Sequence, residues 1–190
     1  GCVVGERLQY PYHGWTFTAD GCGESHGTPK LHGGTTNYDT REEHGVIWLK
    51  SAGATAEFPR FDVDGYYRLG SMTHLARAPL ETALDNFCEI EHTPTTHALF
   101  GYPLERMHEV TTHTEADDAT VRVVNEGPHK PIPRLFKWFI GLRGDITFVD
   151  DWTTHFSPLY TVFDHAFHET ATGKPSRLHW RIYLFLTPET

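Results

Sequence analysis

The sequence is short of cysteine and of positive charge. Its 190 residues include three cysteines, an odd and sparse set that argues against a disulfide framework and favours a reducing compartment. Sixteen Lys and Arg residues face 25 Asp and Glu, for a formal charge of -9, which argues against nucleic acid or an anionic membrane as partner. No apolar run approaches the ~20 residues of a membrane span, and no signal peptide opens the chain. We therefore expect a cytoplasmic protein.

The sequence also lacks an initiator methionine, and its last residues, FLTPET, fall inside a predicted strand. We interpret it as an internal fragment of a longer protein.

Histidine is abundant, at 14 residues. At this frequency about one pair separated by five positions is expected by chance, so such pairs have to be counted. The sequence contains two, His92/His97 and His108/His113. The spacing alone therefore does not identify a metal site.

The predicted fold class is α+β, in two units joined by a linker-like stretch at 51–61. Residues 1–57 are rich in glycine and turn residues and contain short strand candidates, which predicts a small all-β unit. Residues 58–190 are predicted to contain a helix over 80–92 and a short helix over 133–142. Strand candidates in this second unit lie at 107–115, 119–127, 145–169 and 177–187.

The predicted helix over 80–92 is amphipathic. Its apolar residues recur at three- and four-residue spacing on one face (Leu80, Leu84, Phe87 and Ile90). Polar residues share the other face (Glu81, Asp85, Glu89 and His92). Pro79 suits the start of a helix, and Pro94 predicts a break just after His92.

The strand candidate at 177–187 alternates between two faces. Apolar residues lie on one face (Trp180, Ile182, Leu184 and Leu186), and aromatic or polar residues on the other (His179, Arg181, Tyr183 and Phe185). The second face suits either the inner wall of a ligand cavity or an ordinary half-buried strand, and the pattern does not decide between them.

The stretch LQYPYHGWTF, residues 8–17, resembles the second ligand loop of Rieske-type non-haem iron oxygenases. The resemblance extends from residue 5 to 21 and through HGVIWLK at 44–50. It implies that His13 takes the place of an imidazole ligand of a [2Fe–2S] cluster. Tyr10 stands where the family has a cysteine, and a phenol is a hard oxygen ligand that does not reproduce a thiolate. The alternative is a generic β-turn with a surface histidine.

A second constellation, DNFCEIEHTPTTH at 85–97, suits the two-histidine, one-carboxylate triad that holds Fe(II) by one face. Five residues on a continuous helix turn through about 500°, which would leave His97 about 140° away from His92. The break predicted at Pro94 is what makes convergence plausible. His108 and His113 read as strand, where an odd separation puts side chains on opposite faces, so we reject that pair.

Glu89 lies three residues before His92, within reach of its free ring nitrogen. A carboxylate there would fix the tautomer and raise the basicity of the ligand. The alternative is that Glu81, Asp85 and Glu89 form a plain solvated acidic face.

This stretch is similar to the same oxygenase family, with Asp85-Asn86, Glu89, His92 and His97 filling the family pattern in order. The resemblance implies that His92 and His97 bind Fe(II), with a third, carboxylate ligand beyond the chain end. It gives catalytic positions to Glu89 and Asn86. Glu89 would help to carry electrons from the cluster of a neighbouring subunit, and the first cluster loop would precede Gly1.

The resemblance further implies that residues 1–57 are the C-terminal part of a Rieske domain. Residues 58–190 would be part of a helix-grip catalytic domain, a curved antiparallel sheet around a helix. The longer protein would be the oxygenase α subunit, a homo-oligomer that is a trimer in the family. With O2 and electrons from an NAD(P)H-linked reductase or ferredoxin, it would hydroxylate or demethylate an aromatic or other apolar substrate.

Two alternatives to this enzyme stay open. One is a non-catalytic helix-grip module that holds an apolar ligand and has lost its cluster, as Tyr10 suggests. The other is a zinc protein that uses Cys22 with His26 and His32, although no paired C-x-x-C is present.

Overall fold

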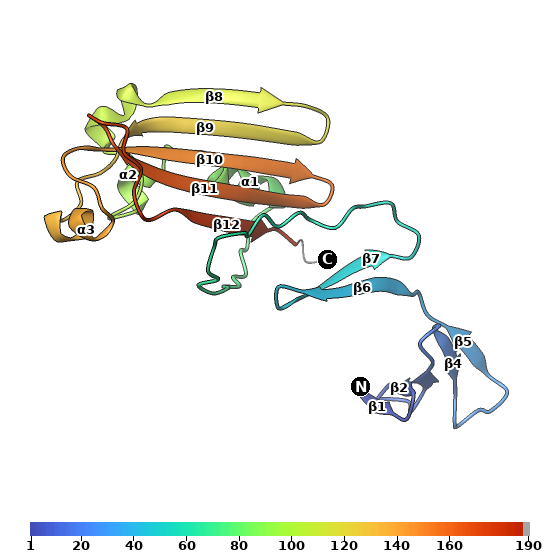
Figure 1. The fold of residues 1–190 in the computed structure, drawn as a ribbon. Coiled ribbons are helices and arrows are strands. Elements are labelled where there is room, and N and C mark those ends of the chain that lie inside the picture. The colour runs from blue at the N-terminus through green and yellow to red at the C-terminus, as the bar shows by residue number, and fades with distance from the viewer. Residues whose placement is uncertain (188–190) are drawn as a thin grey trace. The chain divides into compact units, whose positions relative to one another are not determined.

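A computed structural model describes residues 1–187 as two compact units, Gly1–Ala56 and Glu57–Thr190. Both units are built mainly from antiparallel strands, and helices are few and short (Figure 1). This agrees with the α+β class predicted from the sequence. Within residues 1–187, no helix combines the length and the apolar character needed to cross a membrane.

The first unit contains one five-stranded sheet and a separate hairpin. The sheet runs in chain order through β1 (Cys2–Val4), β2 (Arg7–Gln9), β3 (Thr16–Phe17), β4 (Cys22–Glu24) and β5 (His32–Gly34). The hairpin pairs β6 (Tyr38–Glu43) with β7 (Val46–Ser51). Trp15 packs closely over Gly33, where an added Cβ would lie 3.0 Å from its ring. The lack of a side chain at Gly33 therefore leaves room for the indole.

The second unit contains a five-stranded antiparallel sheet in the order β12-β11-β10-β9-β8. Its strands are β8 (Thr111–Ala116), β9 (Thr120–Pro128), β10 (Ile146–Phe156), β11 (Leu159–Glu169) and β12 (Trp180–Phe185). Along β10, every second residue from Ile146 to Thr154 is buried, so one face of the sheet carries the core. In Figure 1, α2 and α3 lie near the end of the sheet where β10 begins.

The helices are shorter than the sequence predicts. They are α1 (Leu80–Phe87), α2 (Thr93–Thr96) and α3 (Arg134–Phe139), with a 3-10 helix, η1 (Leu104–Glu109). The prediction that 107–115 is one strand was wrong in its first half, because η1 extends to Glu109 and β8 begins at Thr111. The argument that His108 and His113 lie on opposite faces of one strand therefore does not apply. His108 lies in η1, and exposed His113 in β8 has Nε2 3.2 Å from Oε1 of Glu115.

The core lies where the chain between α1 and β8 crosses the inner face of the sheet. Phe148 at its centre is completely buried, and Tyr102 packs against it with ring centroids 5.4 Å apart. The other buried members are Ile140, Leu142, Ile146 and Phe167, and Ile90 and Phe100 pack against them. The core thus holds the segment 90–102, which contains both histidines of the predicted metal site, against the sheet.

The aromatic and polar face of β12 packs against another segment of the chain. Residues 58–66 cover it: Phe61 packs on Tyr183 with centroids 4.8 Å apart, and the Arg181 guanidinium lies 4.9 Å from the centre of the Tyr66 ring. Arg181 also donates to the carboxylates of Asp62 and Asp164. Of the two interpretations of this strand, the structure shows the ordinary half-buried one.

Replacing Phe148 with Ala should destabilise the second unit by about 3–5 kcal/mol, because the lost ring leaves a cavity in a closely packed core. Urea unfolding followed by tryptophan fluorescence measures this. Leu135→Ala on α3 is the control: Leu135 is 76% exposed, and its loss should stay within about 0.5 kcal/mol. Equal effects of the two changes would contradict the core described above.

The Asp164–Arg181 contact should make stability depend on pH. Burial raises the pKa of Asp164, but hydrogen bonds from Arg181 and His179 outweigh it and hold that pKa below its ordinary value. A lowered folded-state pKa stabilises the fold above the ordinary value of about 3.9 and loses that contribution as pH falls through the folded-state pKa. The Tm advantage of wild type over Asp164→Asn should therefore be full at pH 6 and shrink below pH 4. An advantage that grows as the pH falls would contradict this.

Candidate metal centre

His92 and His97 face one another across α2. Their Nε2 atoms lie 3.3 Å apart, and their rings meet edge to face with centroids 5.2 Å apart. Two nitrogens at that separation, each about 2.1 Å from one ion, subtend an angle of about 100° at the ion. The pair therefore has the geometry of two adjacent ligands of a single metal ion.

The chain brings the two rings together differently from the sequence-based expectation. The predicted helix over 80–92 ends at Phe87, so the break lies before His92, and Pro94 falls in the first turn of α2 and breaks nothing. His92 caps the start of α2 with helical angles (φ -76, ψ -24), whereas His97 turns extended (ψ 123). The two rings therefore meet across one short turn of helix, without a break at Pro94.

Glu89 contacts both the backbone and the ring of His92 in the segment that follows α1. One Glu89 oxygen accepts the His92 backbone N–H at 3.1 Å, and the other contacts His92 Nδ1. A local side-chain acceptor of this kind competes with the helical hydrogen bond to the backbone. At the end of α1, Cys88 lies 3.5 Å from the Thr154 hydroxyl on β10, and Ile90 packs against the core. Glu89 thus lies in a turn and not on a solvated helix face.

The charges at the pair suit metal binding. Burial lowers the pKa of His97, and the nearby His92 and Lys130 lower it further, so the neutral ring with a free lone pair is favoured. Burial raises the pKa of Glu89, but its side-chain contact with Glu91 and the hydrogen bonds from the ring and backbone of His92 outweigh this and hold that pKa below its ordinary value. An ionised Glu89 accepts the proton of His92 Nδ1 and leaves Nε2 free as a ligand.

Other residues that the motif singles out lie outside this contact. Asp85 and Asn86 are exposed on α1, and the Asn86 side chain has no hydrogen bond within residues 1–187. Among the same residues, no three His, Cys, Asp or Glu side chains are grouped to hold a metal ion. His92 and His97 therefore stand as a pair of imidazoles, a donor type that suits Fe(II), without a third such side chain beside them among these residues.

The loop around Tyr10 is a hairpin connection between β2 and β3. Tyr10 N–H donates to the Trp15 carbonyl at 2.7 Å, Gly14 N–H donates back to the Tyr10 carbonyl, and Gly14 adopts a φ of 67° that favours glycine. Tyr10 and His13 are both exposed, with ring centroids 6.1 Å apart. This donor set is one imidazole and one phenol, without the thiolate a [2Fe–2S] cluster needs. The residues of this loop do not fit the cluster.

Cys22 has the wrong electrostatics for a zinc thiolate. Its Sγ lies 3.5 Å from Asp20 Oδ2, and the hydrogen bond and negative charge of Asp20 raise the pKa of the Cys22 thiol. A metal thiolate requires the opposite shift. His26 and His32 form no three-ligand group with Cys22 within the described chain.

No protein-family model, curated protein or solved structure matches the chain. The resemblance to Rieske-type oxygenases therefore rests on the motif residues alone.

The sequence did not indicate a polar row across the inner face of the sheet. Asn125, Asp150, His165 and Trp180 are direct cross-strand partners on β9 to β12. The Trp180 indole donates to His165 Nδ1 at 2.5 Å, and His165 Nε2 lies 2.9 Å from an Asp150 oxygen that receives no well-directed hydrogen bond. Period-two spacing would place these residues on one face, but only the register between strands brings them into line.

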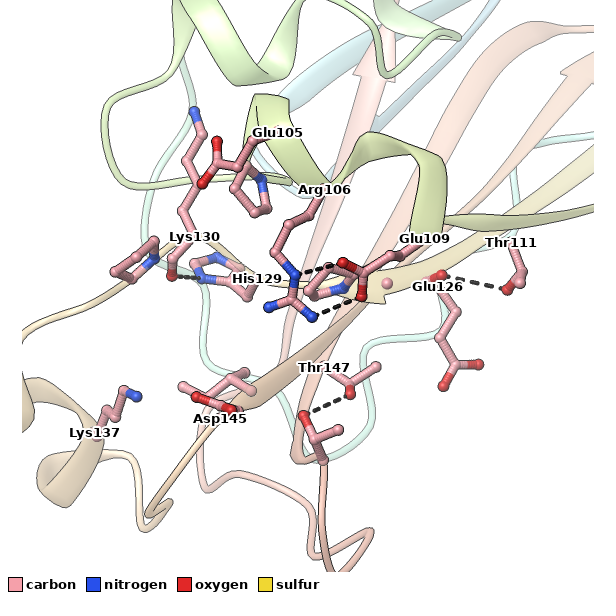
Figure 2. Close-up of a pocket in the computed structure, with 16 residues that line it drawn as sticks. Glu105, Arg106, Glu109, Thr111, Glu126, His129, Lys130, Lys137, Asp145 and Thr147 are labelled. Atoms are coloured by element: carbon pink, nitrogen blue, oxygen red, sulfur yellow. Dashed lines mark hydrogen bonds and ion pairs between the residues drawn. The ribbon is translucent and has the colours of Figure 1, made fainter.

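Figure 2 shows a pocket of about 420 Å³ at the end of the sheet, lined by residues of η1 and by the chain around His129. Within it, Arg106 binds both carboxylate oxygens of Glu109 at 2.7 Å. His129 is 8% exposed, and its Nδ1–H donates to the Lys130 carbonyl at 2.7 Å. The Lys130 side chain runs away from the pocket to the carbonyl oxygens of α2.

Replacing Glu89 with Ala should change the tautomer of His92. In wild type the carboxylate holds the proton on Nδ1; without it, the ring should shift toward the Nε2–H form that predominates in free imidazoles, as seen by ¹⁵N NMR of the side-chain nitrogens. Glu81→Ala, on the exposed side of α1, is the matched control and should leave His92 unchanged. An unaltered His92 spectrum in the Glu89 variant would contradict the contact.

Proposed function

We propose that His92 and His97 are two of the three protein ligands of a mononuclear Fe(II) site in an oxygenase of the Rieske type. The single observation that carries the proposal is the 3.3 Å separation of their Nε2 atoms on a segment held against the sheet. The third ligand would be a carboxylate from outside residues 1–187. The second unit would then be part of a helix-grip catalytic domain.

Each residue of the segment has a defined task in this proposal. His92 and His97 offer neutral Nε2 atoms to one face of the ion, which leaves the remaining positions open for O2 and substrate. Glu89 holds the proton of His92 Nδ1 and so orients that ring. Bound Fe(II) would supply the activation of O2 that neither imidazole can perform.

The described residues do not include a site that could supply electrons to the proposed iron. Tyr10 and His13 do not form a cluster site, so no electron step is assigned to the first unit. In the proposal, Glu89, which contacts Nδ1 on the side of the His92 ring away from Nε2, would lie on the route of electrons supplied by an NAD(P)H-linked reductase or ferredoxin. The substrate class, aromatic or otherwise apolar, follows from the resemblance.

A second candidate is a non-catalytic ligand-binding module. The observation that favours it is the exposed phenol of Tyr10 in the place of a cluster thiolate. Such a module would need no convergence of His92 and His97, and metal binding by this pair distinguishes the two candidates.

Replacing either His92 or His97 with Ala should abolish binding of one Co(II) ion per chain, because a single imidazole leaves no chelate. Co(II) serves as an air-stable probe for Fe(II), and absorption titration follows its binding. His108 and His113 have the same five-residue spacing elsewhere in the chain, so His108→Ala and His113→Ala serve as controls and should bind Co(II) as wild type does. Equal loss from all four variants would mean that the wrong pair has been assigned.

A further inference from the structure

The short helix α2, which separates the two histidines, cannot hold its shape by itself. It has four residues, Thr93–Thr96, whereas isolated helices shorter than about 12 residues are marginal in water. Its N-cap residue, His92, makes no side-chain capping hydrogen bond. The carbonyls at its C-terminal end also need partners that a helix of this length does not supply.

Lys130 supplies these partners from a different part of the chain. Its ammonium donates to the carbonyls of Thr93 at 2.7 Å and Pro94 at 2.9 Å, and also to the carbonyl of His97. All three oxygens belong to α2 or to the residue that caps it. A cation at the C-terminal end of a helix also matches the negative end of the helix dipole.

Hydrogen bonds hold the backbone of Lys130 in place, so its side chain extends toward α2 from a fixed position. Lys130 N–H donates to the Gly101 carbonyl at 3.1 Å. Its own carbonyl accepts the Nδ1–H of His129, whose ring packs edge to face against both Phe148 and Phe167 in the core. Figure 2 shows this hydrogen bond and the Lys130 side chain extending away from it.

We infer that Lys130 is a positioning residue for the metal centre: it holds α2 in the one conformation in which the His92 and His97 rings converge. This rests on the proposed function, because the consequence of the contact is ligand geometry. Lys130 donates to the His97 carbonyl and not to its ring, so it acts on the backbone that directs the ring.

The experiment compares Co(II) binding and hydrogen exchange across three lysine variants of the full chain. Lys130→Met keeps an unbranched side chain of similar length without the three donor hydrogens, and it should weaken Co(II) binding about tenfold or more, as is usual for residues that orient a ligand. Lys130→Arg retains a cation with several donors and should recover most of the affinity and the Co(II) absorption bands. Lys137→Met is the matched control, because Lys137 donates to the Gly144 carbonyl away from α2.

Hydrogen exchange of the His97 amide, which donates to the Thr93 carbonyl at 3.3 Å, reports on α2 without metal. Lys130→Met should speed this exchange, and Lys137→Met should not. Wild-type affinity and exchange in Lys130→Met would overturn the inference and leave the proposed function standing. The same loss in the Lys137 variant would also overturn it, since it would show a general effect of removing charge.

If wild type itself binds no Co(II), the proposed function fails, and the exchange data decide the inference alone. Faster exchange of the His97 amide in Lys130→Met alone would then support the inference that Lys130 holds α2 in its conformation. Unchanged exchange would reject that inference.

Discussion

The two imidazoles converge across one short turn of helix, α2, which is held by contacts on either side of it. Before α2, one Glu89 oxygen accepts the His92 amide hydrogen and the other contacts Nδ1 of the His92 ring. After α2, the His97 amide donates to the Thr93 carbonyl, and the backbone becomes extended at His97. Positions five apart on a helix lie about 140° apart around its axis, so the approach of the two Nε2 atoms to 3.3 Å depends on the directions of the two side chains.

The sheet gives this short segment a rigid base. Ile90 and Phe100 pack against the core on either side of it, and Phe100 lies with its ring centroid 6.0 Å from that of His97. The inner face beneath is partly polar, since Asn125, Asp150 and His165 are buried there. Burying a carboxylate beside an imidazole is costly unless the two interact, so this row limits the ways in which the strands can pair.

Most strands of the second unit could be predicted from the sequence. The strands at 119–127, 145–169 and 177–187 were predicted because β-branched and aromatic residues dominate them, and β9 to β12 lie within these ranges to within one residue. The position of the helix break was not predicted, because the apolar spacing continues to Ile90 whereas the helix ends at Phe87. The contacts of Lys130 with α2 could not be predicted either. Lys130 and His97 are 33 residues apart in the sequence, and the spacing of apolar residues does not show which distant segments meet.

In the first unit, a motif in the sequence does not amount to a cluster site. The loop around Tyr10 combines a turn, a glycine at positive φ and an exposed histidine, but its phenol does not replace a thiolate. The proposed function therefore rests on the second unit alone.

X-ray absorption of the chain loaded with one equivalent of Fe(II) tests the central claim most directly, because it counts imidazole ligands at the metal. The account predicts two imidazole nitrogens at about 2.1 Å in wild type, and in His97→Ala, which should not retain the metal, only the spectrum of the unbound aqueous ion. A metal environment with one imidazole or none, or one that His97→Ala leaves unchanged, would contradict it.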